Sequence, residues 1–212
     1  SCNMSEHMAL ENLTVLDLTR VLAGPFCTMM LADMGANVIK IEVPKGGDDT
    51  RSYPPFRAKN LNGERESVYF ANINRNKKGI TLNLKAPEGK EIFKELVKKA
   101  DIVVENYRPG VMDKLGLGYD VLKEINPRII YAAVSGFGCY GPYHLRPGYD
   151  ILAQAMGGMM SITGSKGGEP TRAGSALGDI LGGLHVTIGI LAAVNARTIT
   201  GKGQRVDVSL MD

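Results

Sequence analysis

Short apolar runs alternate with amphipathic stretches along most of this 212-residue chain. Six runs have the length and β-branched content of strands, at residues 13–18, 37–42, 80–84, 101–105, 128–134 and 204–210. The stretches that favour helices lie at 25–35, 87–100, 119–125, 149–156 and from about 179 onward. Alternating strands and helices indicate a mainly parallel sheet with helices on both faces. We therefore expect a Rossmann-like α/β fold that binds ligands at the carboxyl ends of its strands.

The remaining segments suggest how the chain is organised. Residues 1–8 are polar and end in His7-Met8, and we expect a tag or a disordered start there. Residues 9–212 are expected to form one large domain. Within it, residues 44–66 are rich in Gly and Pro, which predicts a long surface excursion. The clearest helix is predicted at 87–100, and its expected buried stripe consists of Ile92, Phe93, Leu96, Val97 and Ala100.

Charge and cysteine content argue against several classes of protein. Twenty-five Lys and Arg against 22 Asp and Glu give a net charge of +3, too balanced for binding nucleic acid through its phosphates. The three cysteines form no disulfide framework, which indicates a reducing compartment, and we expect a cytoplasmic location. The longest uncharged stretches, 129–145 and 180–196, are shorter than the roughly 20 apolar residues of a membrane span. We therefore expect no interaction with nucleic acid or membrane.

Familiar cofactor motifs are weak or missing. Gly136, Gly138 and Gly141 have the spacing of a dinucleotide-binding loop, but Pro142 follows at once where such a loop needs a helix. We interpret this segment as a glycine-rich turn and expect no nicotinamide cofactor. The sequence contains neither the glycine-rich NTPase loop nor the serine-hydrolase elbow. Its three histidines lack metal-ligand spacing, so we expect no metal site.

Basic residues cluster in the middle of the chain. Arg75, Lys77 and Lys78 lie close together, and a second set follows in loops or at the ends of predicted strands, namely Lys85, Arg108, Lys114 and Arg146. Taken singly, each of these residues is most simply a solvated side chain on a turn. Taken together, several cations around one pocket would suit a polyanionic cofactor that carries phosphate groups.

Asp179 is the most informative carboxylate. It lies where an apolar, glycine-rich helix is predicted to begin. One hypothesis is a helix N-cap, a role that Asp favours. The other is a nucleophile that attacks an activated acyl group, with the backbone N–H groups of a glycine loop holding the oxyanion. Gly164, Gly167 and Gly168 provide a candidate for that loop.

Seven segments together resemble the family III CoA-transferases, in order and along nearly the whole chain. They are LDLTRVLAGP at 16–25, GANVIKIE at 35–42, GDDTR at 47–51, NRNKK at 74–78, VENYRPG at 104–110, RPGYD at 146–150 and TGKGQRVDV at 200–208. The resemblance implies that CoA moves from an acyl-CoA donor to a carboxylic acid acceptor. It also implies a Rossmann-like domain that binds CoA, with no metal.

The same resemblance assigns residues to roles. Asp179 matches the family's nucleophile, which attacks the thioester to form an acyl-aspartyl anhydride and then an aspartyl-CoA thioester. Coenzyme A or acyl-CoA is the implied substrate. The contacts with CoA implied by motif position are Leu22, Ala23, Leu82, Asn83, Lys85, Asn106, Tyr107, Arg108, Lys114, Arg146, Tyr149 and Asp150.

The resemblance leaves alternatives open. The 2-methylacyl-CoA racemases share the fold but use a His where this chain has Tyr149, a poor proton-transfer group near neutral pH. The formyl-CoA:oxalate members carry Gln at the position of Leu22, and one of their basic contacts aligns with Pro147, beside Arg146. Family members continue into a second domain and interlock as dimers, so we expect self-association here. A catalytically incomplete CoA-binding fragment is the third alternative.

Overall fold

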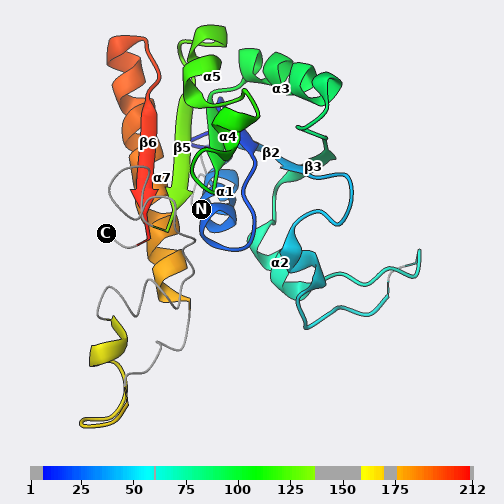
Figure 1. The fold of residues 1–212 in the computed structure, drawn as a ribbon, viewed down its shortest axis with the longest axis vertical. Helices are drawn as coiled ribbons and strands as arrows, with labels where there is room; N and C mark the ends of the chain where they lie inside the picture. The colour runs from blue at the N-terminus through cyan, green and yellow to red at the C-terminus, as the bar shows by residue number, and fades with distance from the viewer. Residues whose placement is uncertain (1–6, 60, 137–158, 170–175, 211–212) are drawn as a thin grey trace, which may run out of the picture.

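The computed structural model describes residues 7–59, 61–136, 159–169 and 176–210. Its centre is a six-stranded parallel sheet with the strand order β3-β2-β1-β4-β5-β6 (Figure 1). The strands are β1 Thr14–Asp17, β2 Asn37–Glu42, β3 Lys78–Thr81, β4 Ile102–Glu105, β5 Ile130–Ser135 and β6 Arg205–Ser209. This order confirms the predicted Rossmann-like architecture, because the chain runs outward in both directions from neighbouring strands β1 and β4.

Helices cover both faces of the sheet. The helical segments are α1 Ala23–Asp33, η1 Asp49–Ser52, α2 Val68–Ile73, α3 Pro87–Lys99, α4 Val111–Lys114, α5 Tyr119–Ile125, η2 Met159–Ile162 and α7 Leu177–Thr200. Helices α1 and α7 pack on one face, where Cys27 and Ile190 join a single buried cluster with the strands. Helices α3, α4 and α5 pack on the other face, around Phe93 and Leu122. Strands whose residues are all buried, such as β4, fit this arrangement, since helices cover both of their faces.

Several expectations need correction. The third strand covers residues 78–81 and not 80–84, and α2 and α4 were not expected. Ile92 does not belong to the buried stripe of α3, because 51% of its surface is exposed. The 44–66 excursion lies mostly on the surface, yet Asp48 and Thr50 within it are buried. The helix predicted at 149–156 lies outside the described residues.

The long helix α7 combines a buried face with an exposed apolar face. By length and composition alone it could cross a membrane, and it is the one helix among the described residues that could. Its buried residues Val186 and Ile190 pack instead in the core against the strands. On the other side Leu181, Leu184 and Ile188 are exposed, Ile188 to 65%. Helix α7 therefore leaves a row of apolar side chains exposed at the surface.

Candidate functional site

A pocket of about 630 Å³ opens at the carboxyl ends of four neighbouring strands. It lies at the edge where Rossmann-like sheets bind their ligands, beside the point at which strand order reverses. Each of the loops that follow β1, β2, β3 and β4 contributes to its walls. The lining residues are Arg20, Ile41, Glu42, Val43, Pro44, Lys45, Leu82, Asn83, Leu84, Lys85, Tyr107, Arg108, Val111 and Leu115.

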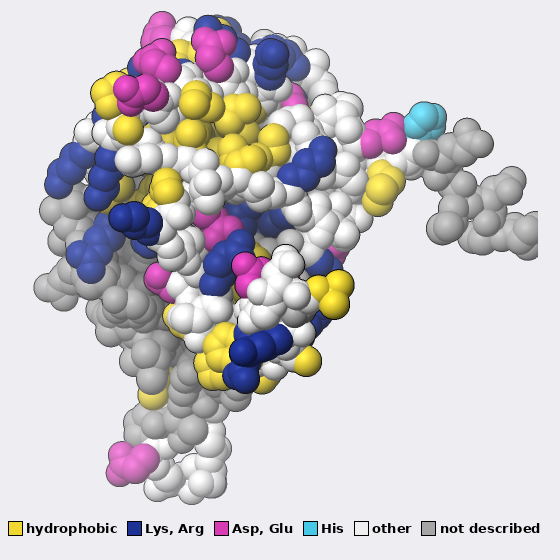
Figure 2. Space-filling view, turned by 90° about the vertical axis from the view of Figure 1, so that its right-hand side faces the viewer, with side chains coloured by type: hydrophobic (Ala, Val, Ile, Leu, Met, Phe, Trp, Pro, Cys, Tyr) yellow, Lys and Arg dark blue, Asp and Glu magenta, His cyan; other side chains and the backbone are white. Residues whose placement is uncertain are grey.

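Positive charge dominates the polar part of this pocket. Its basic lining residues are Arg20, Lys45, Lys85 and Arg108. Glu42 is the acidic lining residue, and Arg51 neutralises it through contacts of 2.6 and 2.8 Å. Lys and Arg side chains gather around a hollow at the left of the face shown in Figure 2. The pocket therefore combines apolar walls with cations that can meet phosphate groups.

Tyr107 adds an aromatic ring to the pocket wall, and its position is fixed by a buried carboxyl group. Its backbone N–H donates to Glu105 Oε2 at 2.9 Å, while the Tyr131 hydroxyl donates to Oε1 at 3.1 Å. Burial raises the pKa of Glu105 to about 7, despite these two hydrogen bonds. The guanidinium of Arg20 lies 5.6 Å from the centre of the Tyr107 ring. Such a ring can pack against an adenine or a pantetheine chain.

The structure brings together five of the predicted CoA contacts. Those that line the pocket are Leu82, Asn83, Lys85, Tyr107 and Arg108. Lys114 is exposed on the short helix α4 but is not a lining residue. Arg20 and Lys45 also line the pocket, but they were not predicted as CoA contacts. Each follows a predicted strand: Arg20 lies in the matched segment 16–25, and Lys45 lies three residues after the segment 35–42. Arg146, Tyr149 and Asp150 lie outside the described residues.

Three further predicted contacts are not among the lining residues of the pocket. Asn106 does not line the pocket, and its side chain bonds the backbone of Arg20. Leu22 is the N-cap residue of α1, and Ala23 is buried in the first turn of that helix. All three lie on or beside the turn that joins β1 to α1. This turn also carries Arg20, which lines the pocket.

Two residues of the basic cluster at 75–78 form ion pairs within the protein. Lys77 is buried and lies 3.1 Å from Asp17, whose side chain is fully buried. Burial alone would raise the pKa of Asp17, but Lys77 and then Lys40 hold it below its ordinary value. Arg75 forms an exposed ion pair with Asp33 at 2.7 Å. These two ion pairs are therefore structural. They join the segment before β3 to α1 through Asp33 and to β1 through Asp17.

Asp179 lies in the first turn of α7 and is not its N-cap residue. The helix begins at Leu177 and its N-cap is Ala176, so the capping hypothesis is wrong. Four residues further on, Gly183 packs so closely on α1 that an added Cβ would lie 2.8 Å from the Ala23 carbonyl oxygen. Residues four apart share a helix face, so Asp179 is on the face that meets the start of α1. Figure 1 shows the start of α7 toward the arrowheads of β5 and β6.

Other candidate features give no site among the described residues. No group of His, Cys, Asp and Glu side chains there could hold a metal ion. Gly164 and Gly167 have positive φ values of 106° and 78°, as expected for a glycine loop near η2. Cys27 is a free, buried thiol whose pKa burial raises to about 12. It is therefore a core residue without nucleophilic character.

Comparisons with known proteins agree with this geometry. A family model described as CoA-transferase family III matches residues 10–212. The chain is 52% identical over 211 residues to a protein of Fusarium pseudograminearum named acyl-CoA transferase, covering 98% of this chain and 46% of that protein. It is 50% identical over 203 residues to the acetyl-CoA:oxalate CoA-transferase of Acetobacter aceti, covering 95% and 51%.

A solved structure shows the same fold. The crystal structure of a CAIB/BAIF family protein from Brucella suis matches with a TM-score of 0.93 and 46% identity, over 98% of this chain and 54% of that one. The chain spans about half the length of the curated relatives it matches. It belongs to CoA-transferase family III.

Proposed function

We propose that the protein containing this chain transfers CoA from an acyl-CoA to a carboxylic acid, with Asp179 as the nucleophile. The observation that carries the proposal is the pocket at the carboxyl edge of the sheet, where Arg20, Lys45, Lys85 and Arg108 surround apolar walls. Its charge and its 630 Å³ volume suit part of a ligand with several phosphate groups and an adenine ring. The family membership supports the same assignment.

The chemistry proceeds by exchange at one carboxylate. An Asp179 oxygen attacks the thioester carbonyl carbon, the C–S bond breaks, and CoA leaves as a thiolate. The acyl-aspartyl anhydride is then attacked by that thiolate at the Asp179 carbonyl, which releases the first acid and leaves an aspartyl-CoA thioester. An acceptor carboxylate reverses both steps, taking CoA as its own thioester and restoring the Asp179 carboxylate.

The position of Asp179 supports this role. It lies in the first turn of α7, where the partial positive charge of the helix N-terminus stabilises a carboxylate. That turn meets the start of α1, which follows directly from the Arg20 loop of the pocket. A long CoA molecule held by its phosphates at Lys85 and Arg108 could extend its thioester toward this helix. Water must be kept from the anhydride, since hydrolysis would waste the thioester.

Self-association belongs to the same proposal. The exposed apolar face of α7, with Leu181, Leu184 and Ile188, supports burial against another protein surface. We include an interlocked homodimer and a cytoplasmic location in the proposal. The family resemblance supports the dimer, and the sparse cysteines support the location.

Replacement of Asp179 by Asn tests the catalytic assignment in a protein that contains this chain. Transfer from an acyl-CoA to a panel of mono- and dicarboxylic acids is measured by mass spectrometry of the CoA thioesters. We expect Asp179→Asn to reduce turnover by at least about a thousandfold, because an amide cannot form the anhydride. The matched control is Asp120→Asn, which removes the same charge from the first turn of α5. Near-normal turnover by Asp179→Asn would contradict the assignment.

A further inference from the structure

The turn between β1 and α1 is held in an unusual backbone conformation. Val21 has a φ of +70°, in the left-handed region that β-branched residues rarely adopt. The other described non-glycine residue with positive φ is Asn76, at 64°, and Asn tolerates this region well. Strain of this kind persists only where the surrounding structure enforces it, and it is concentrated at functional sites. Contacts from outside the turn must therefore hold Val21 in this conformation.

Asn106 holds the turn from the loop that follows β4. Its side-chain Oδ1 accepts a hydrogen bond from the Arg20 N–H at 2.9 Å, and its Nδ2 donates to the Arg20 carbonyl oxygen at 2.6 Å. Both ends of the side-chain amide are thus used on the backbone of a single residue. Because Arg20 precedes Val21, these two bonds fix the peptide plane on which the φ of Val21 depends.

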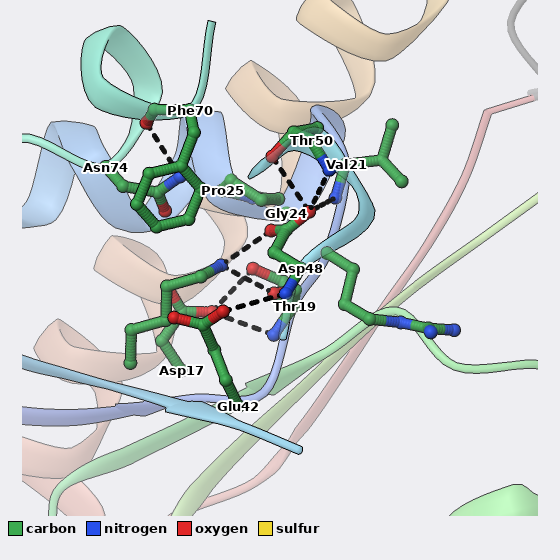
Figure 3. Close-up of polar contacts among 12 residues, drawn as sticks. Asp17, Thr19, Val21, Gly24, Pro25, Glu42, Asp48, Thr50, Phe70 and Asn74 are labelled. Atoms are coloured by element: carbon green, nitrogen blue, oxygen red, sulfur yellow. Dashed lines mark hydrogen bonds and ion pairs between the residues drawn. The ribbon is translucent and has the colours of Figure 1, made fainter. Parts of the chain in front are cut away.

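Asp48 holds the turn from the opposite side. Its Oδ1 accepts a hydrogen bond from the Val21 N–H at 3.2 Å, and the neighbouring Lys40 Nζ donates to the Thr19 carbonyl oxygen at 2.9 Å. Lys40 and Asp48 form an ion pair at 2.9 Å, with side chains only 3% and 0% exposed. Figure 3 shows the Val21 side chain pointing away from this network, so only its backbone is engaged. A buried pair of this kind is a rigid anchor for the turn.

The clamped turn connects the two halves of the proposed site. Arg20 lines the pocket and lies over Tyr107, another lining residue. Two residues after Val21, the chain reaches Ala23, whose carbonyl oxygen meets Gly183 of α7, one turn from Asp179. A shift of the turn would therefore move a pocket cation and the surface against which the nucleophile helix packs.

We propose that Asn106 and Asp48 are positioning residues, which clamp the backbone of Arg20 and Val21 so that the turn presents Arg20 to the CoA pocket. This inference rests on the proposed function, because it takes CoA as the ligand of the pocket. It assigns Asn106 a role different from that of a direct contact with CoA. The clamp and the direct contact predict different behaviour when the strain at Val21 is removed.

A double-mutant cycle between Asn106 and Val21 tests the clamp. Glycine adopts positive φ without a steric penalty, so the clamp matters less in a Val21→Gly background. CoA affinity is measured by calorimetry for the unsubstituted protein, Asn106→Ala, Val21→Gly and the double variant. We expect Asn106→Ala to weaken CoA binding about tenfold in the unsubstituted background and about twofold in the Val21→Gly background. Asp48→Asn should show the same dependence on Val21.

The outcomes separate this inference from the function on which it rests. An equal loss of affinity in both backgrounds would show that Asn106 contacts CoA directly, and it would overturn the clamp. Binding of CoA by the unsubstituted protein and by Asn106→Ala with equal affinity would also overturn the clamp while leaving the proposed function standing. Failure of the unsubstituted protein to bind CoA would overturn the proposed function and this inference together. Circular dichroism confirms the fold of each variant, and Asn106→Ala carries the test because its side chain is only half-buried.

Discussion

Glu105 shows how a single residue of this site is adjusted by its surroundings. It ends β4, and its residue surface is only 8% exposed. Burial raises its pKa to about 7, while Tyr131, Tyr107 and the more distant Arg205 favour the charged form and Asp207 opposes it. Its carboxylate orders the loop that carries Tyr107 and Arg108 into the pocket. The Glu105 carboxyl group therefore supports this loop, and its pKa lies near neutral pH.

Replacement of Glu105 by Gln should change the pH dependence of stability. The folded-state pKa of about 7 exceeds the ordinary value of 4.5, so the folded protein binds more protons than the unfolded chain between these values. The stability that this group contributes is complete below about pH 4.5 and is lost as the pH rises through about 7. The free energy of unfolding of Glu105→Gln, taken relative to that of the unsubstituted protein, should therefore rise by about 3 kcal/mol when the pH is raised from about 4 to about 8. Urea unfolding at both pH values measures this, and an unchanged difference would contradict it.

For single residues, the sequence predicts which ones belong near the site more reliably than it predicts the contacts that each one makes. Lys85 and Arg108 could be assigned to a phosphate pocket, because each follows a strand of a parallel sheet. Lys77 could not be recognised as a core residue, since its partner Asp17 lies 60 positions earlier and the pairing depends on the packing of β3 near α1. Asn106 was likewise placed at the site, but only the structure shows its bonds to Arg20.

Among the elements, the central strands were predictable and the edges were not. Strands β4 and β5 consist largely of buried apolar residues, and such runs stand out in a sequence. Strand β3 lies at the sheet edge with all four residues exposed, so its apolar pattern is weak and its position was predicted two residues late. Helix α4 has only four residues, too few to show a helical period.

The contact between α1 and α7 yields a prediction about the glycines of α7. An added Cβ at Gly183 would lie 2.8 Å from a backbone oxygen and 2.9 Å from the ring of Phe26. We expect Gly183→Ala to lower the free energy of unfolding by about 1–3 kcal/mol, because this overpacking exceeds the gain in helix propensity. Denaturant unfolding provides the measurement.

Gly182→Ala is the matched control for this contact. At Gly182 the added Cβ would meet only the end of the Leu210 side chain, which can rotate away. We expect this variant to be unchanged or stabilised by up to about 1 kcal/mol. Equal destabilisation by both substitutions would show that the close approach of α7 to Ala23 is not what holds the start of this helix in place.

For the molecule as a whole, the exposed face of α7 predicts self-association. Leu184 and Ile188 project from a helix whose other face is already buried in the core. We expect light scattering to find this chain in an oligomer, and Leu184→Glu with Ile188→Glu to shift it toward the monomer. Leu61→Glu is the control, because Leu61 is fully exposed on a loop away from α7. A monomeric unsubstituted chain that transfers CoA efficiently would contradict both the association and its proposed role.

A covalent adduct on Asp179 is the direct product of the proposed chemistry, and its detection tests the nucleophile. An active protein that contains this sequence is mixed with an acyl-CoA and no acceptor acid, then digested, and the peptide that carries Asp179 is analysed by mass spectrometry. Nucleophilic catalysis by Asp179 predicts an added mass of an acyl group or of CoA on that residue, conversion to a hydroxamate by hydroxylamine, and no adduct in Asp179→Asn. Turnover without any adduct at Asp179, or an adduct on another residue, would contradict it.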